Sequence, residues 1–193
     1  MLHLVNLEEI QNLLLRIPRL VDSLEQRDPN FVQKVRQWLT VVEEVLVNNR
    51  MPLGGNIAAL RGTLDATERG AFPPGLTFHG RPTARKIKEA TGADVVRRAG
   101  ELISNALQDD VSRFAEAERL SHQLIALGKS MGLIVGGISD SAPTQKLKDL
   151  WKTISADPNI APGAARLESL VGQNDALILL DRAITIDTVP ANG

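Results

Sequence analysis

The stretch from Asp94 to Met131 most constrains how this chain of 193 residues can fold, because apolar residues recur every three or four positions along it. Between Asp94 and Leu127 it holds no proline and a single glycine, Gly100. The pattern predicts one helix of about 55 Å, at a rise of about 1.5 Å per residue. Its apolar stripe must be covered by other segments or by another molecule. The stripe comprises Val96, Ala99, Ile103, Leu107, Val111, Phe114, Ala117, Leu120, Leu124, Leu127 and Met131.

Shorter stretches with the same spacing predict further helices. They are expected over residues 6–24 with a kink at Pro18, from Pro29 to the turn NNRMPLGG, and over 56–69, 83–90, 144–156 and 163–183. Gly92 is expected to end the helix 83–90, so that Asp94 can begin the next one. The tail ITIDTV alternates between apolar and polar residues, which predicts a short strand or an extended arm.

These patterns predict an all-α fold, an elongated bundle of six or seven helices built around one long helix at about 94–131. Aromatic residues make up only 3% of the chain, so interdigitating aliphatic rows must fill the interior. Two domain organisations remain open. The chain forms a single helical domain over 1–193, or N-terminal helices 1–70 and a long-helix bundle 81–183 are joined by the Gly- and Pro-rich loop 70–82.

Composition excludes several kinds of function. The chain has no cysteine, which removes disulfides, thiolate metal sites and cysteine nucleophiles. The net charge of −1 gives no global attraction to nucleic acid or anionic lipid. The N-terminal sequence carries Glu8 and Glu9 and has no basic leading region, and no run approaches the roughly 20 apolar residues of a spanning helix. We therefore expect a soluble, cytoplasmic protein.

The segment ALGKSMGLIVGG, which ends the long periodic stretch, allows three interpretations. Its letters GKS, from Gly128, match the end of a phosphate-binding loop, but Gln123 stands where that motif needs its first glycine. Gly128, Gly132 and Gly136 are spaced by four, which would place three glycines on one helix face and suit close packing or membrane insertion of the segment 128–138. We expect instead that the helix crosses a neighbour at Gly128 and ends towards Gly136.

A basic stretch covers residues 81–98. Its six cations face two carboxylates, a local excess of four; they are Arg81, Arg85, Lys86, Lys88, Arg97 and Arg98 against Glu89 and Asp94. Clustered Lys and Arg bind polyanions by releasing counterions. We favour a solvated helix surface as the explanation, because no aromatic residue is interleaved and no DNA-binding motif accompanies them.

Residue types that carry catalysis or metal binding are present but not in a convincing arrangement. Glu118 and His122 lie one helical turn apart, whereas a catalytic zinc site usually needs three protein ligands. Acidic doublets such as Glu43 and Glu44 diverge by about 100° on a helix and cannot converge on one atom. We identify no catalytic, cofactor-binding or metal-binding residue and expect no cofactor.

The sequence therefore predicts a non-enzymatic helical module for protein–protein interaction, such as an adaptor, regulatory or assembly subunit, with another protein or a second copy as partner. One alternative is a membrane-acting helical protein that uses the segment 128–138. Another is a nucleic-acid-binding regulator that uses the stretch 81–98. The candidate interaction residues are Arg81, Arg85, Lys88, Arg97, Arg98, Gly128, Gly132 and Gly136.

Overall fold

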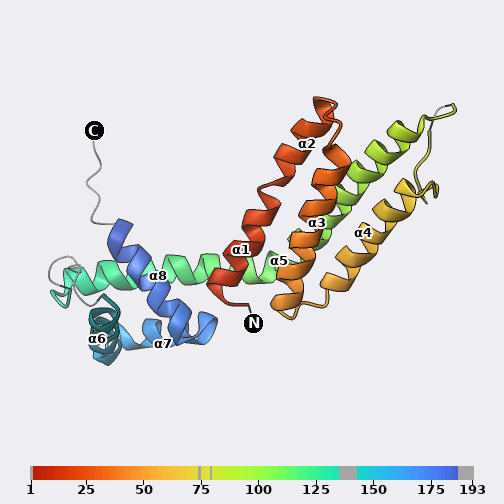
Figure 1. The fold of residues 1–193 in the computed structure, drawn as a ribbon. Helices are drawn as coiled ribbons and strands as arrows, with labels where there is room; N and C mark the ends of the chain where they lie inside the picture. The colour runs from red at the N-terminus through yellow and green to blue at the C-terminus, as the bar shows by residue number, and fades with distance from the viewer. Residues whose placement is uncertain (1, 74, 79, 135–142, 187–193) are drawn as a thin grey trace, which may run out of the picture. The chain divides into compact units, whose positions relative to one another are not determined.

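The computed structural model describes residues 2–73, 75–78, 80–134 and 143–186. Within these ranges the chain forms eight helices and no strand, which confirms the all-α fold with one long helix (Figure 1). The helices are α1 (Leu4–Leu14), α2 (Ile17–Glu25), α3 (Phe31–Asn48), α4 (Gly54–Glu68), α5 (Ala84–Ser130), α6 (Pro143–Ala156), α7 (Ala161–Val171) and α8 (Gln173–Ile186).

Contacts between residues divide the chain into two compact units, and the boundary lies inside α5. The N-terminal unit comprises Leu2 and Leu4–Gln108, and the C-terminal unit comprises His3 and the residues from Asp109 onwards. The Gly- and Pro-rich loop 70–82 lies within the N-terminal unit. Glycine and proline content indicates where the chain turns, whereas the boundary between the units depends on which helices are in contact. The Gly- and Pro-rich loop and the boundary therefore do not coincide here.

In the N-terminal unit the apolar stripes of α1 to α4 and of the first part of α5 meet in one core. Helix α3 contacts α1, α2 and α4. Two glycines bring α5 close to its neighbours: a Cβ atom at Gly92 would lie 2.8 Å from a ring carbon of Phe31, and one at Gly100 would lie 3.0 Å from Cδ1 of Ile17. Residues with no exposed surface include Val35, Leu39, Val42, Leu46, Ile57, Leu64, Ala99 and Ile103.

In the C-terminal unit α6, α7 and α8 contact one another, and α7 packs on the second part of α5. Gly163 permits this approach, because a Cβ atom there would lie 2.7 Å from Cδ2 of Leu124. An ion pair between Arg166 and Glu116 joins the same two helices at the surface. The most deeply buried large side chains of this unit are Ile125, Ile154, Ile160, Leu167 and Leu180.

The long helix begins earlier than the sequence predicted. Gly92 was expected to end a short helix, but α5 runs through it without interruption, and the Thr91 hydroxyl donates to the Ile87 carbonyl one turn back at 2.8 Å. The glycine is needed for its missing side chain, which makes room for Phe31, and not for a left-handed backbone. A sequence pattern cannot distinguish these two uses of glycine.

Three other helix ends differ in detail from the prediction. The break near Pro18 falls at residues 15–16, so that α2 starts with proline in its first turn, where the missing amide is harmless. The expected helix 163–183 is divided into α7 and α8 at Gly172, whose φ is 81°. Ile184 to Ile186 belong to α8 and do not form an extended tail; the rest of that tail lies outside the described residues.

Four helices end in the same hydrogen-bonded motif. The second residue after α2, α3, α4 and α5 has a positive φ, and the next amide donates to a carbonyl five residues back; the four residues are Arg27, Arg50, Gly70 and Gly132. After α3, for example, the Met51 amide donates to the Leu46 carbonyl at 2.9 Å. Glycine is the usual residue at this position because it lacks a Cβ atom, yet two of the four are arginine.

Replacing Arg50 by glycine is expected to raise the free energy of unfolding by about 0.5–1 kcal/mol. A left-handed backbone costs an L-residue about 1–2 kcal/mol, and the greater freedom of unfolded glycine cancels part of that gain. The Arg50 side chain forms no hydrogen bond or ion pair with the described residues, so none is lost. Urea unfolding measures the change. Gly132→Ala, in the same motif, should shift stability in the opposite direction; equal effects would contradict the assignment.

Candidate interaction site

Most of the basic side chains predicted to form an interaction surface have acidic partners on α5 itself. The ion pairs are Arg85–Glu89, Arg97–Asp94, Arg97–Glu101 and Arg98–Asp94, with N···O distances of 2.7 to 2.8 Å. The Arg97 guanidinium donates hydrogen bonds to Asp94 and to Glu101, and these bonds raise the pKa of Arg97 above its usual value. Arg81 and Lys88 have no such partner among the described residues. The charge available to a polyanion is therefore smaller than the sequence suggested.

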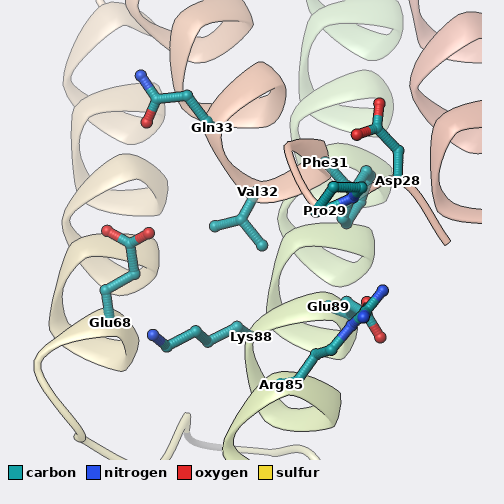
Figure 2. Close-up of a pocket in the computed structure, with 9 residues that line it drawn as sticks. All are labelled: Asp28, Pro29, Phe31, Val32, Gln33, Glu68, Arg85, Lys88 and Glu89. Atoms are coloured by element: carbon teal, nitrogen blue, oxygen red, sulfur yellow. The ribbon is translucent and has the colours of Figure 1, made fainter.

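A cavity of about 360 Å³ lies where the α2–α3 turn, the end of α4 and the start of α5 meet (Figure 2). It brings together Arg85 and Lys88 of the predicted surface, but Asp28, Glu68 and Glu89 also line it. Three carboxylates against two cations give the lining a formal charge of −1. A cavity of this charge does not complement a phosphate group. The remaining lining residues are Pro29, Phe31, Val32 and Gln33.

Asp28 holds the turn between α2 and α3 together. Its carboxylate accepts hydrogen bonds from Lys34 Nζ at 2.6 Å, from the Asn30 amide at 2.8 Å and from the Ser23 hydroxyl at 2.9 Å. The bond from Lys34, then those from Asn30 and Ser23, lower the pKa of Asp28 from 3.8 to about 2. With its lone pairs occupied in this way, Asp28 serves the turn and is not available to a ligand.

The lowered pKa makes the Asp28 contribution to stability depend on pH. Because the folded-state pKa of about 2 is below the ordinary value of 3.8, the contribution is complete above 3.8 and is lost as the pH falls towards 2. Asp28→Asn should therefore be less stable than the wild type near neutral pH, with a gap that narrows between 3.8 and about 2. Urea unfolding of both proteins across this range measures the gap. A gap that stays constant with pH would contradict the network.

The glycines of the predicted surface do not share one helix face. Gly128 lies in the last turn of α5, and its missing Cβ atom makes room for Ile134, whose Cδ1 would be 2.9 Å away. Gly132 lies beyond the end of the helix with a φ of 70°, and Gly136 falls outside the described residues. The chain is helical through Ser130, whereas a phosphate-binding loop must follow a strand. The helix therefore ends at Ser130, before Gly136, and the close contact at Gly128 is with Ile134 of the following turn and not with a crossing helix.

A second surface, not predicted from the sequence, lies between α2 and α3, which run side by side in Figure 1. It is a groove of about 610 Å³ lined by Arg16, Arg19, Leu20, Lys34, Gln37, Trp38 and Val41, and we call it the cationic groove. Three of these seven residues are basic and none is acidic. Unlike the cavity beside Lys88, the groove complements a negatively charged ligand.

The spacing of residues along α2 puts two cations of the groove on one face of that helix. Arg16 and Arg19 are three residues apart where α2 begins, so their side chains lie on the same face beside Leu20. Neither guanidinium forms a hydrogen bond or ion pair with the residues that the structure describes. Lys34, on the facing helix, is already paired with Asp28 at 2.6 Å. Arg16 and Arg19 are thus the cations that remain for a ligand.

The floor of the groove is apolar and fixed in place. Trp38 is only 4% exposed, and its indole N–H donates to the Leu13 carbonyl at 2.9 Å, next to the break between α1 and α2. Leu20 is buried, and Val41 lies one turn from Trp38 on the same face of α3. The Trp38 ring is too covered to stack on a base, and it gives the groove a rigid floor for an apolar side chain.

The cationic groove had a weak signal in the sequence. Arg16, Arg19 and Leu20 follow helical spacing, as do Lys34, Trp38 and Val41, but nothing in the sequence indicates that the two stripes face each other. Basic residues are dense at 81–98, so the sequence predicted an interaction surface there instead. The density of basic residues along the sequence gives only their number, whereas the structure shows which of them are neutralised by acidic neighbours.

No metal centre or membrane-spanning element emerges from the part of the chain that is described. Glu118 and His122 lie on α5 as expected, and within the described ranges no group of three or more His, Cys, Asp or Glu side chains is placed to hold a metal ion. None of the described helices combines the length and apolar character needed to cross a bilayer.

The chain was compared with protein families, curated proteins and solved structures. No family model matches it, and no curated protein or solved structure is detectably similar.

Proposed function

We propose that this chain is a helical protein–protein interaction module whose cationic groove binds an acidic segment of another protein. One observation carries the proposal: Arg16 and Arg19, which have no partner among the described residues, stand over an apolar floor in a groove of about 610 Å³. Guanidinium groups bind carboxylates in a fixed, bidentate geometry, and such charge-assisted bonds are stronger than neutral ones. The groove therefore favours a ligand with carboxylates placed about one helical turn apart.

The apolar floor favours a peptide over a free polyphosphate. Val41, which is partly exposed beside the buried Leu20 and Trp38, offers apolar surface that gains free energy when an apolar side chain covers it. An amphipathic segment presents such a side chain together with its carboxylates, whereas a polyphosphate has only charge. The proposed role is that of an adaptor, regulatory or assembly subunit.

A peptide-display selection tests the proposal and needs no named partner. Immobilised full-length protein is exposed to a random peptide library at low salt, and the enriched sequences are read. We expect enrichment of peptides that combine Asp or Glu with an apolar residue at helical spacing. A synthetic peptide of that pattern should lose affinity by about tenfold or more on Arg16→Gln/Arg19→Gln, because two charge-assisted bonds are removed.

A charge-matched control distinguishes the groove from general attraction. Arg69→Gln/Arg81→Gln removes the same charge from exposed side chains that do not line the groove, and it should leave peptide affinity nearly unchanged. Equal losses in the two double variants, or a selection that enriches no acidic peptides, would show that the groove is not the binding site. Urea unfolding of both variants confirms that the fold is retained.

A further inference from the structure

One end of the N-terminal unit carries a group of cations that have no partner within the described part of the chain. The α2–α3 turn, the end of α4 and the start of α5 meet there, around the cavity in Figure 2. The basic side chains at this end that form no hydrogen bond or ion pair with described residues are Arg27, Arg69, Arg81, Lys86 and Lys88, and we call this group the basic end. The four apart from Lys88, which is half-buried, are exposed.

Most of the carboxylates near the basic end already form ion pairs with other basic side chains. Asp28 is paired with Lys34, Glu68 with Arg36 and Glu89 with Arg85. Glu25, the last residue of α2, is the unpaired carboxylate among the described residues here. Among the residues that the structure describes, five unpaired cations against one unpaired carboxylate leave a local positive charge.

An exposed aromatic residue lies in the loop that joins α4 and α5 at this end. Phe72 is 58% exposed, and its ring meets the ring of Phe78 edge to face, with centroids 5.7 Å apart. Gly75 and Gly80, both with a φ of 83°, shape the loop, and Gly75 lies beside the Arg98 guanidinium. The two rings therefore form one apolar tip in the loop that follows Arg69 and precedes Arg81 in the chain.

We propose that the basic end and the Phe72 tip bind the surface of a membrane that contains anionic lipids. Cations near such a surface are attracted to its headgroups, and an apolar side chain that enters the headgroup boundary adds a hydrophobic contribution. The arrangement supplies both, with Phe72 as the inserted residue. Because the two phenylalanine rings pack on each other, they suit insertion as a pair better than stacking between separate bases.

Vesicle binding tests this inference on the full-length protein. Flotation is compared for vesicles of phosphatidylcholine alone and with phosphatidylserine, at low and high salt. We expect binding only to the vesicles with phosphatidylserine, weakened by salt. Each Lys or Arg near an anionic surface contributes about fivefold, so Arg69→Gln/Arg81→Gln/Lys86→Gln should weaken binding about 100-fold. Phe72→Ser should weaken it about tenfold through lost apolar burial.

Two comparisons make the result decisive. Arg16→Gln/Arg19→Gln, which removes charge from the cationic groove, should leave vesicle binding unchanged, so this inference and the proposed function can fail separately. Duplex DNA of random sequence serves as a second polyanion. Binding to DNA with no dependence on Phe72, and no binding to either vesicle, would assign the basic end to nucleic acid and overturn the inference. Equal binding to both vesicles, or none to either vesicle or to DNA, would overturn it as well.

Discussion

Replacing Ile103 by alanine is expected to lower the free energy of unfolding of the N-terminal unit by about 2–5 kcal/mol. Ile103 lies on α5 with no exposed surface, among the side chains of the unit's core. Removing its outer carbons both forfeits their burial and leaves a cavity that the packed surroundings fill only in part. Urea unfolding followed by circular dichroism measures the loss.

A control on the same helix is Val111→Ala, eight residues further along and in the C-terminal unit. The periodic pattern places Val111 on the same apolar stripe, but its side chain is 37% exposed. Little burial is lost there, so the change should stay within about 0.5 kcal/mol. If Val111→Ala lowered the free energy of unfolding as much as Ile103→Ala, the Val111 side chain would have to be covered by another molecule or segment.

Replacing Gly92 by proline is expected to cost about 3 kcal/mol or more. Proline inside a helix removes one amide donor, and its ring clashes with the carbonyl four residues back. Gly92 is the position at which the sequence predicted a helix end and the structure has a continuous helix. At a helix end the same replacement would leave the bonds of the preceding turn intact, so the measured cost discriminates between the two structures.

Two further variants separate the backbone effect from other causes. Gly92→Ala adds the same Cβ atom against Phe31, which would lie 2.8 Å from the nearest ring carbon, but keeps the amide. The difference in the free energy of unfolding between Gly92→Pro and Gly92→Ala therefore measures the cost of the lost amide donor and of the clash with the proline ring. Ala84→Pro places proline at the first position of α5, where its missing donor does no harm, and should be nearly neutral. Similar stability of Gly92→Pro and Gly92→Ala would contradict a continuous helix.

The sequence predicted the helical elements well because helices are local. Apolar spacing found the central parts of α3, α4, α5 and α6, and the turns around them were recognised from proline and glycine. The apolar spacing was less accurate in predicting which residues of the stripe are buried. Val111, Leu127 and Met131 fit the period but are 37%, 39% and 38% exposed. Periodicity identifies a helix face, and only neighbouring helices determine how much of that face is covered.

The candidate sites depended on tertiary structure more strongly. Within the basic stretch, Arg97 and Arg98 share Asp94 on the same helix, a pairing that i, i+3 and i, i+4 spacing allowed in advance. The cationic groove and the basic end join residues from separate helices. Arg19 and Trp38 are brought together by the packing of α2 on α3, and nothing in either local sequence indicates that packing.

The sequence by itself determined that this chain is helical, that most of residues 94–131 belong to one long helix and which residue types the chain lacks. These properties follow from local spacing, capping and composition, which act within a few residues of each other. Tertiary structure alone decided that Gly92 makes room for Phe31, that the unit boundary lies inside α5 and that Arg16 and Arg19 find no partner among the described residues. Those outcomes depend on contacts between distant segments, whose free energies no local pattern records.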